Sequence, residues 1–170
     1  MYDFLPYLKT SSFYILLVTT LLIAASGYVI NDIFDVDTDQ INKPGKLIIG
    51  KHIDESKAFT FYMVLTGLGI LGSFVLIYTT QQMKISMIPL MVSVLLYLYA
   101  SSLKKVFLAG NIVISICAIL PIIFLALYDL RINEFDTAVV ILFTQGIGLG
   151  ALVYGTFAFL TTMSREIIKD

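Results

Sequence analysis

Charged residues divide the chain into five long apolar stretches. The stretches without Asp, Glu, Lys or Arg cover approximately residues 12–30, 58–80, 85–102, 107–128 and 137–160. A helix needs about 20 apolar residues to cross a bilayer, and these stretches are close to or above that length. Backbone groups cannot stay unpaired in lipid, and the stretches do not alternate in polarity as barrel strands do. The pattern therefore predicts an all-α, polytopic membrane protein with five transmembrane helices and a single domain, residues 1–170.

Basic residues gather in the segments that five successive spans bring to one side. That side holds eight of the eleven Lys and Arg residues: Lys43, Lys46, Lys51, Lys57, Lys104, Lys105, Arg165 and Lys169. The opposite side holds Lys9, Lys84 and Arg131. Basic loops stay in the cytoplasm, so the bias assigns the first side to the cytoplasm. We expect an integral protein of the cell (inner) membrane with cytoplasmic active-site loops.

The overall composition agrees with a membrane protein and excludes other classes. Hydrophobic residues make up 58% of the chain and charged residues 14%, against about 25% charged residues in a soluble domain. The net charge of −1 offers no attraction to nucleic acid, which we do not expect as a partner. Cys117 is the single cysteine and lies in an apolar run, so we interpret it as a packing residue.

Small residues predict where helices approach one another. Gly67, Gly69 and Gly72 lie in the second stretch, and Gly146 and Gly150 form a GxxxG pair in the fifth. Such residues let helix backbones come close together in a membrane. A separate prediction concerns Pro121, which we expect to kink the fourth stretch.

One polar segment, residues 31–39 (NDIFDVDTD), follows the first stretch. On a helix with about 100° per residue, Asn31, Asp32, Asp35 and Asp39 share about one-third of the surface, whereas Asp37 points elsewhere. Like charges one turn apart repel, and carboxylates near a helix C-terminus oppose the helix dipole. The cluster therefore calls for a cation, and its oxygen ligands suit Mg²⁺, which also binds substrate phosphates. An acidic solvated loop is the alternative interpretation.

Lysines close to this segment suit a phosphate. Lys43, Lys46 and Lys51 follow within twelve residues of Asp39. A lysine meets phosphate oxygens as a point charge while carboxylates hold the metal. The alternative is that these lysines only signal topology.

Three segments resemble motifs of the UbiA superfamily of intramembrane prenyltransferases. Residues 31–39 with Asn42-Lys43-Pro44 resemble its first aspartate-rich motif. Residues 99–105 (YASSLKK) with Gly110-Asn111 resemble its "YSxxLK…GN" segment, and residues 165–170 (REIIKD) resemble the run that enters its second aspartate-rich motif. Two departures occur: Lys46-Leu47 stands where the family commonly has Arg-Pro, and Ala100 replaces a serine. They remove a bidentate fork and a hydroxyl from the expected diphosphate contacts.

The resemblance implies a nine-helix bundle around a central cavity, of which the five stretches would be the second to sixth helices. The first helix and everything after the start of the second motif would then be missing. The resemblance also implies Mg²⁺ as cofactor, bridging the two motifs and the diphosphate. Its implied metal ligands are Asp32, Asp35, Asp39 and Asp170. The implied catalytic residues are Asp32, Asp35, Asp39 and Lys104. The implied substrate-binding residues are Asn31, Lys43, Lys46, Tyr99, Asn111 and Arg165.

The expected function is Mg²⁺-dependent transfer of a prenyl group from a prenyl diphosphate to an acceptor. The Asn-Lys-Pro end of the first motif is similar to that of members which alkylate geranylgeranylglycerol phosphate, and we favour that lipid acceptor. An aromatic acceptor of the quinone, tocopherol or chlorophyll type is the first alternative. A non-catalytic membrane remnant and a cation transporter are the others, although a transporter usually places its carboxylates at mid-membrane. We also expect the 170-residue chain alone to be inactive, because only one aspartate-rich motif is whole.

Overall fold

A computed structural model describes residues 10–42, 44–45, 47–106, 109–129 and 147–169, and these residues are almost all helical. The helices are α1 (Thr10–Asn42), α2 (Glu55–Thr80), α3 (Met83–Ser86), α4 (Ile88–Ser101), α5 (Ala109–Asp129) and α7 (Ile147–Lys169). A short 3₁₀ turn, Leu103–Lys105, joins α4 to the segment before α5. Within the described ranges no strand occurs apart from an isolated bridge between Ile49 and Ile53. The all-α prediction is therefore confirmed for this part of the chain.

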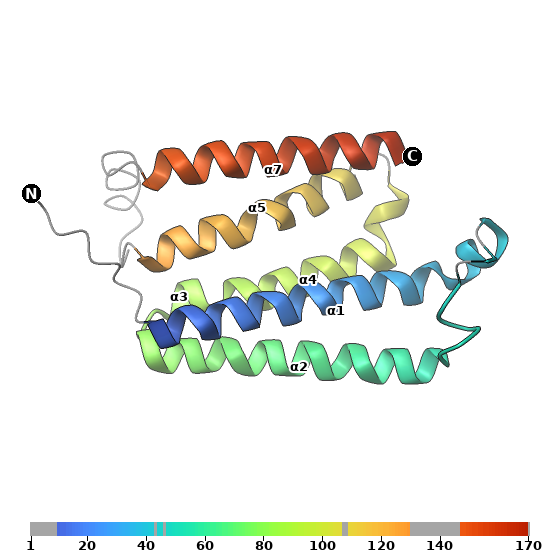
Figure 1. Cartoon of the computed structure of the whole chain (residues 1–170), viewed down its shortest axis with the longest axis horizontal. Helices are drawn as coiled ribbons and strands as arrows, with labels where there is room; N and C mark the ends of the chain where they lie inside the picture. Colours follow the sequence, from blue (N-terminus) through green and yellow to red (C-terminus); the bar gives the residue numbers. More distant parts are fainter. Residues whose placement is uncertain (1–9, 43, 46, 107–108, 130–146, 170) are drawn as a thin grey trace, which may run out of the picture.

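The helices run side by side and alternate in direction (Figure 1). α1 packs against α2 and α4, and α5 packs against α7. As a result the end of α1, the Leu103–Lys105 turn and the end of α7 lie at one end of the bundle, and α3 lies at the other (Figure 1). The first end, which we call the lysine end, also receives the loop from α1 to α2.

Small residues hold α1 and α2 together. A Cβ added to Gly69 would lie 2.6 Å from Ile23, and one added to Gly72 would collide with Thr19. The close contacts predicted for these two glycines are therefore confirmed. Among the described residues Gly67 makes no such contact, since a Cβ there would meet no described atom within 4 Å. Gly150 likewise faces open space among the described atoms, and its partner Gly146 lies outside them.

Several hydroxyl groups inside the bundle bond to the helix that carries them, although the buried hydroxyl of Thr66 has no partner among the described residues. Ser26 Oγ donates to the Ile23 carbonyl at 2.8 Å, and Ser115 Oγ donates to the Asn111 carbonyl at 2.6 Å. Local bonds of this kind let small polar residues sit between helices without an unsatisfied group. Many large apolar side chains face outward instead, for example Leu21 and Phe74, each 59% exposed. An apolar exterior with a partly polar interior suits a lipid environment.

Two of the described helices, α1 and α2, are long and apolar enough to cross a membrane. Three shorter apolar segments accompany them, Ile88–Ser101, Ala109–Leu125 and Leu152–Ser164. The third predicted stretch, residues 85–102, is not one continuous helix, because the chain breaks at Met87 between α3 and α4. Proline lacks an N–H and favours the first turn of a helix, so Pro89 explains where α4 begins.

The ends of three other helices differ from the predicted boundaries. α1 continues twelve residues beyond position 30, through the whole acidic segment to Asn42. α5 contains Pro121 and stays helical beyond it to Asp129. α7 runs nine residues beyond position 160, and the first ten residues of the predicted fifth stretch, 137–146, lie outside the described residues.

Candidate diphosphate and metal site

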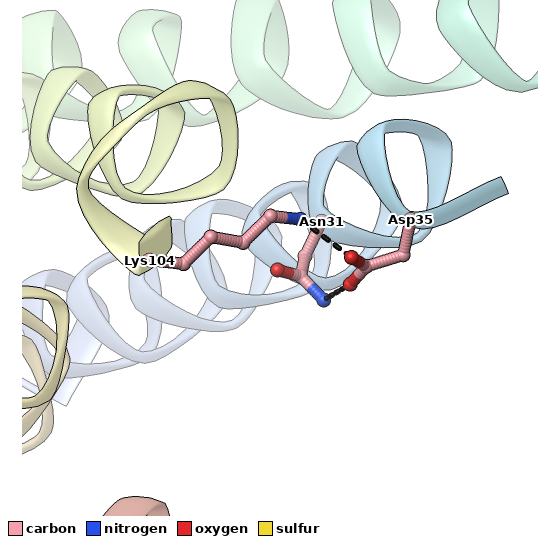
Figure 2. A network of polar contacts seen from close by, with 3 residues as sticks. All are labelled: Asn31, Asp35 and Lys104. Carbon is pink, nitrogen blue, oxygen red and sulfur yellow. Dashed lines mark hydrogen bonds and ion pairs between the residues drawn. The ribbon is translucent and has the colours of Figure 1, made fainter. Parts of the chain in front are cut away.

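The helical continuation of α1 places Asn31 and Asp35 on one face. Because the two residues are four apart, their side chains meet one turn apart on the helix. Asn31 Nδ2 donates a hydrogen bond of 2.9 Å to Asp35 Oδ2 (Figure 2). The amide therefore fixes the orientation of the carboxylate and uses one of its two oxygens.

Lys104 reaches the same carboxylate from the Leu103–Lys105 turn. Its Nζ lies 2.7 Å from Asp35 Oδ1, across 69 residues of sequence (Figure 2). The two side chains are only 15% and 26% exposed, so solvent screens this ion pair less than a surface pair. Asn31, Asp35 and Lys104, three predicted site residues, thus form one connected polar group, which we call the lysine clamp.

The remaining carboxylates separate as the helical spacing predicts. Asp32 is exposed over much of its side chain, yet partial loss of hydration is the main cause that raises its pKa above the usual value of 3.8, and the charges of Asp35 and Asp39 raise it further. Lys104 acts in the opposite direction. Asp37 is exposed and is not among the groups that shift Asp32. One face of α1 therefore carries an excess of negative charge that Lys104 offsets only in part.

The backbone behind Lys104 is tightly packed. A Cβ added to Gly110, at the start of α5, would lie 2.8 Å from both the Leu103 carbonyl oxygen and Lys104 Cα. Backbone atoms cannot yield as a flexible side chain can, so only glycine fits there. Asn111 follows and is 8% exposed. The two parts of the segment that resembles "YSxxLK…GN" therefore meet in space and hold Lys104 in place.

Tyr99 and Ala100 lie on the inner side of α4. Tyr99 is 9% exposed, and Ala100, 1% exposed, packs in an apolar cluster with Ile30 and Tyr62. A serine at position 100 would bury its hydroxyl among these mainly apolar neighbours. Alanine avoids that cost, although the family commonly has serine at this position.

An apolar cavity of about 340 Å³ opens beside the lysine clamp, between α1, α4 and α5. Asn31 and Tyr99 line its polar end. Its other lining residues are Thr20, Ile23, Ala24, Gly27, Tyr28, Ile88, Pro89, Val92, Leu96, Ile114, Cys117, Ala118, Leu120, Pro121, Phe124 and Thr162. From Asn31 to Thr20 the wall extends for eleven residues of α1, or about 16 Å at 1.5 Å per residue. Sequence reasoning missed these residues because an apolar side chain in an apolar stretch carries no signal of its own.

Comparison with known proteins now identifies the family. The sequence profile of the UbiA prenyltransferase family matches residues 5–170. The chain belongs to this family. The resemblance predicted from three motifs is thereby confirmed, and the apolar exterior of the bundle agrees with a family of membrane proteins.

Curated relatives of this UbiA-family chain are named digeranylgeranylglyceryl phosphate synthase. The protein from Sulfolobus acidocaldarius is 33% identical over 165 residues, which cover 94% of this chain and 51% of the relative. The protein from Sulfurisphaera tokodaii is 34% identical over 149 residues, covering 87% of this chain and 47% of the relative. The protein from Methanothermobacter thermautotrophicus is 33% identical and covers 93% and 50%, respectively. The chain thus spans about half the length of these relatives, and no solved structure matches it.

The oxygen donors of the UbiA-family chain fit Mg²⁺ held together with a diphosphate. Within the described residues, no three His, Cys, Asp or Glu side chains gather as a ready metal site. Both oxygens of Asp35 already accept bonds, one from Lys104 and one from Asn31. Mg²⁺ needs only one or two carboxylates when waters and phosphate oxygens complete its shell. Asp32 and Asp39 can supply these carboxylates, and a cation there would relieve the repulsion that raises the pKa of Asp32.

Some predicted site residues lie outside this description. Lys43, Lys46 and Asp170 are not among the described residues, and the side chain of Arg165 is not described. The roles predicted for these four residues, including Asp170 as a metal ligand, stay predictions.

Proposed function

We propose that this chain contributes the first-motif half of a prenyltransferase that transfers a geranylgeranyl group from its diphosphate to geranylgeranylglycerol phosphate. One observation carries the proposal: the lysine clamp reaches an apolar cavity of about 340 Å³ through Asn31, and two further carboxylates, Asp32 and Asp39, lie on the same face of α1. A prenyl diphosphate has the same two parts, a dianionic or trianionic head and a long apolar tail. The names of the relatives support the lipid acceptor over an aromatic one.

The residues of the site match the needs of the reaction. The C–O bond to the diphosphate breaks, an allylic cation forms, and the acceptor hydroxyl attacks that cation and loses its proton. Lys104 would neutralise the charge that builds on the leaving diphosphate, and Asn31 would donate to one of its oxygens. Mg²⁺, when bound by the carboxylates, supplies further charge neutralisation for this leaving group. The apolar walls exclude water, and the ring of Tyr99 at the polar end stabilises a nearby cation.

The proposed site lies on the cytoplasmic side of the membrane. Lys51, Lys57, Lys104 and Lys105 all belong to the lysine end of the bundle (Figure 1). The positive-inside rule supports a cytoplasmic position for that end. A soluble diphosphate head could then approach from water while its tail enters the apolar cavity. The position of the carboxylates at the end of α1, rather than at mid-membrane, disfavours a cation transporter.

The test is transfer by a chimera in which this chain replaces the matching half of the Sulfolobus acidocaldarius relative. We expect Mg²⁺-dependent formation of digeranylgeranylglyceryl phosphate from the two geranylgeranyl substrates. Lys104→Met should lower kcat/KM by about 10²-fold or more, the usual loss for one electrostatic stabiliser of the transition state. Lys105→Met is the matched control, because Lys105 is exposed next to Lys104 and should cost little. A folded chimera that joins the prenyl group only to aromatic acceptors would refute the proposed acceptor.

A further inference from the structure

The contact between Asp35 and Lys104 involves a residue expected to bind metal and a residue expected to bind diphosphate. Each side chain is mostly shielded from solvent, and their charged atoms are 2.7 Å apart. In this arrangement Lys104 is already paired before any diphosphate arrives. A diphosphate that binds Lys104 therefore competes with Asp35 for the same ammonium group.

Both partners of this contact are held by the fold. Lys104 lies in a 3₁₀ turn whose backbone is fixed by the close approach of Gly110. Asp35 precedes Val36, which is 4% exposed and lies near Gly50. The hydrogen bond from Asn31 limits the rotation of the Asp35 side chain. A pair anchored at both ends keeps its geometry at a low cost in side-chain entropy. The ammonium group of Lys104 is thus kept beside Asn31, which lines the polar end of the cavity.

The surrounding charges give the exchange a direction. Lys104 bonds to Asp35, whereas Asp32 and Asp39 lie on the same face of α1, where the charges of Asp35, Asp39 and Lys104 all act on Asp32. A diphosphate carries more negative charge than one carboxylate, so it attracts the lysine more strongly. Once Lys104 leaves, Asp35 is an unpaired carboxylate on an acidic face and becomes available to a cation.

We propose that Asp35 is a positioning residue for Lys104: it holds the ammonium group at the polar end of the cavity and releases it to the incoming diphosphate. This inference rests on the proposed function. It adds that Lys104 changes partner from Asp35 to the diphosphate when the substrate binds, and that Asp35 is then available to a cation. It separates Asp35 from Asp32 and Asp39, which the motif alone treats as equivalent.

The test begins with a measurement that needs no ligand. The amine of each lysine is labelled with an acylating reagent in the purified, detergent-solubilised chain, and the rates are compared by mass spectrometry. Asp35→Asn should speed labelling of Lys104 about fivefold, because the amine is then no longer held against a carboxylate and is more accessible to the reagent. Lys105 is the internal control and should react at an unchanged rate. Equal Lys104 rates in the wild-type chain and in Asp35→Asn would show that Asp35 does not hold Lys104.

The second measurement is binding of inorganic pyrophosphate, followed by calorimetry in EDTA so that no divalent metal contributes. Asp35→Asn should bind about five- to tenfold more tightly than the wild-type chain, the scale set by release of a partly shielded ion pair. Asp32→Asn and Asp39→Asn remove the same charge without freeing Lys104, and each should change affinity less than about twofold. Lys104→Met should abolish the gain produced by Asp35→Asn.

The outcomes separate this inference from the proposed function. Equal gains in pyrophosphate affinity in all three Asp→Asn variants would show that only the net charge of the site matters. This result would overturn the exchange of Lys104 but would not contradict the proposed diphosphate site. Absence of pyrophosphate binding in every variant in EDTA, with binding restored by Mg²⁺, would overturn the exchange and leave the proposed function intact. Absence of binding with Mg²⁺ as well would contradict both. Tighter binding in Asp35→Asn alone, lost again in the double variant with Lys104→Met, would support both.

Discussion

Asp32 lies beyond the predicted membrane span, yet partial loss of hydration and two neighbouring carboxylates raise its pKa. A raised pKa in the folded chain means that the ionised carboxylate is less favourable there than in the unfolded chain. Asp32 therefore favours folding at pH values below its unfolded pKa, and this contribution is lost as the pH rises through the raised value. The ionised carboxylate of Asp32 thus opposes folding unless a cation binds beside it.

The first prediction concerns this charge. In buffer without divalent metal at pH 7, Asp32→Asn should raise Tm by about 1–3 °C, and the gain should shrink as the pH falls towards the usual Asp value of 3.8 and vanish below it. Added Mg²⁺ should then raise Tm of the wild-type chain more than that of the variant. Thermal unfolding followed by circular dichroism in detergent measures both effects. An unchanged difference between pH 7 and pH 4 would contradict the assigned cause.

The second prediction separates Asp32 and Asp39 from Asp37 by their place on α1. In the chimera, Asp32→Asn and Asp39→Asn should each lower prenyl transfer by about 10²-fold, as removal of a group that stabilises the transition-state charge does. Asp37→Asn is the matched control, because Asp37 is exposed and outside the acidic face. It should leave kcat/KM within about threefold of the wild-type value. A loss of the same size for Asp37→Asn would show that helical position does not sort these residues.

Sequence reasoning predicted the members of the lysine clamp but not their contact. Asn31, Asp35 and Lys104 stood out because polar residues are rare in an apolar chain, and their spacing placed two of them on one helix face. No spacing rule links Asp35 to Lys104, since that contact depends on how α4 packs against α1. The cavity-lining residues Gly27 and Leu96 were not predicted at all, because their neighbours along the sequence are just as apolar.

The position of Lys104 depends on where helices end and how closely they contact one another. α5 begins against the Leu103–Lys105 turn, and Gly110 allows this approach because it has no side chain. Gly67 in α2 offers the opposite case, a glycine with open space around its Cα. The two positions make a matched pair for the same substitution.

The third prediction uses this pair. Gly110→Ala forces a Cβ against two backbone atoms at 2.8 Å, so the turn must shift and the unfolding free energy should fall by about 1–3 kcal/mol. Prenyl transfer by the chimera should fall by at least about tenfold, since a small displacement of a charged group is costly in an active site. Gly67→Ala should instead stabilise α2 by about 0.5–1 kcal/mol without loss of transfer. Normal activity of Gly110→Ala would show that the turn is not held by this contact.

The fourth prediction concerns the wall of the cavity between α1 and α4. A Cβ added to Gly27 would lie 2.8 Å from Leu96 Cδ1, and both residues line the cavity. Leu96 has a flexible end, so Gly27→Ala should displace it and narrow the cavity. The ratio of kcat/KM for geranyl over geranylgeranyl diphosphate should rise by about tenfold, a typical value for small changes in an apolar pocket.

Removing the displaced side chain provides the control for that prediction. The double variant Gly27→Ala with Leu96→Ala should recover the wild-type preference for the longer donor. An equal loss of kcat/KM for both donors in Gly27→Ala would show that this part of the wall does not select the length of the prenyl chain. No recovery in the double variant would show the same.

The position of each helix was predictable where charged residues mark its ends, as they do for α1 and α2. The division between α3 and α4 was not predicted, because the charge-free stretch continues across Met87 and only Pro89 signals a new start. The extension of α1 through the acidic segment was also underestimated. Hydropathy shows where a helix can lie in lipid, whereas the hydrogen-bonded helix continues into water until its backbone turns.

The two ends of the bundle differ in the charged groups that they carry. The lysine end carries the clamp, the carboxylates and the loop from α1 to α2, and the opposite end carries Lys84 on α3 (Figure 1). The sequence predicted this division from the bias of basic residues, and the alternating helix directions of the described residues agree with it. The orientation of the bundle in the membrane follows only from the positive-inside rule and stays a prediction.

The fifth prediction tests that orientation with single cysteines in a Cys117→Ala background. Lys51→Cys and Lys105→Cys report on the lysine end, Lys84→Cys reports on the opposite end, and all three positions are exposed. A membrane-impermeant maleimide added to intact cells should label position 84 and should label positions 51 and 105 only after permeabilisation. The opposite pattern would place the lysine clamp outside the cell, away from the cytoplasmic pool of prenyl diphosphates. Labelling of all three positions in intact cells would contradict a spanning bundle, because the two ends would then share one side.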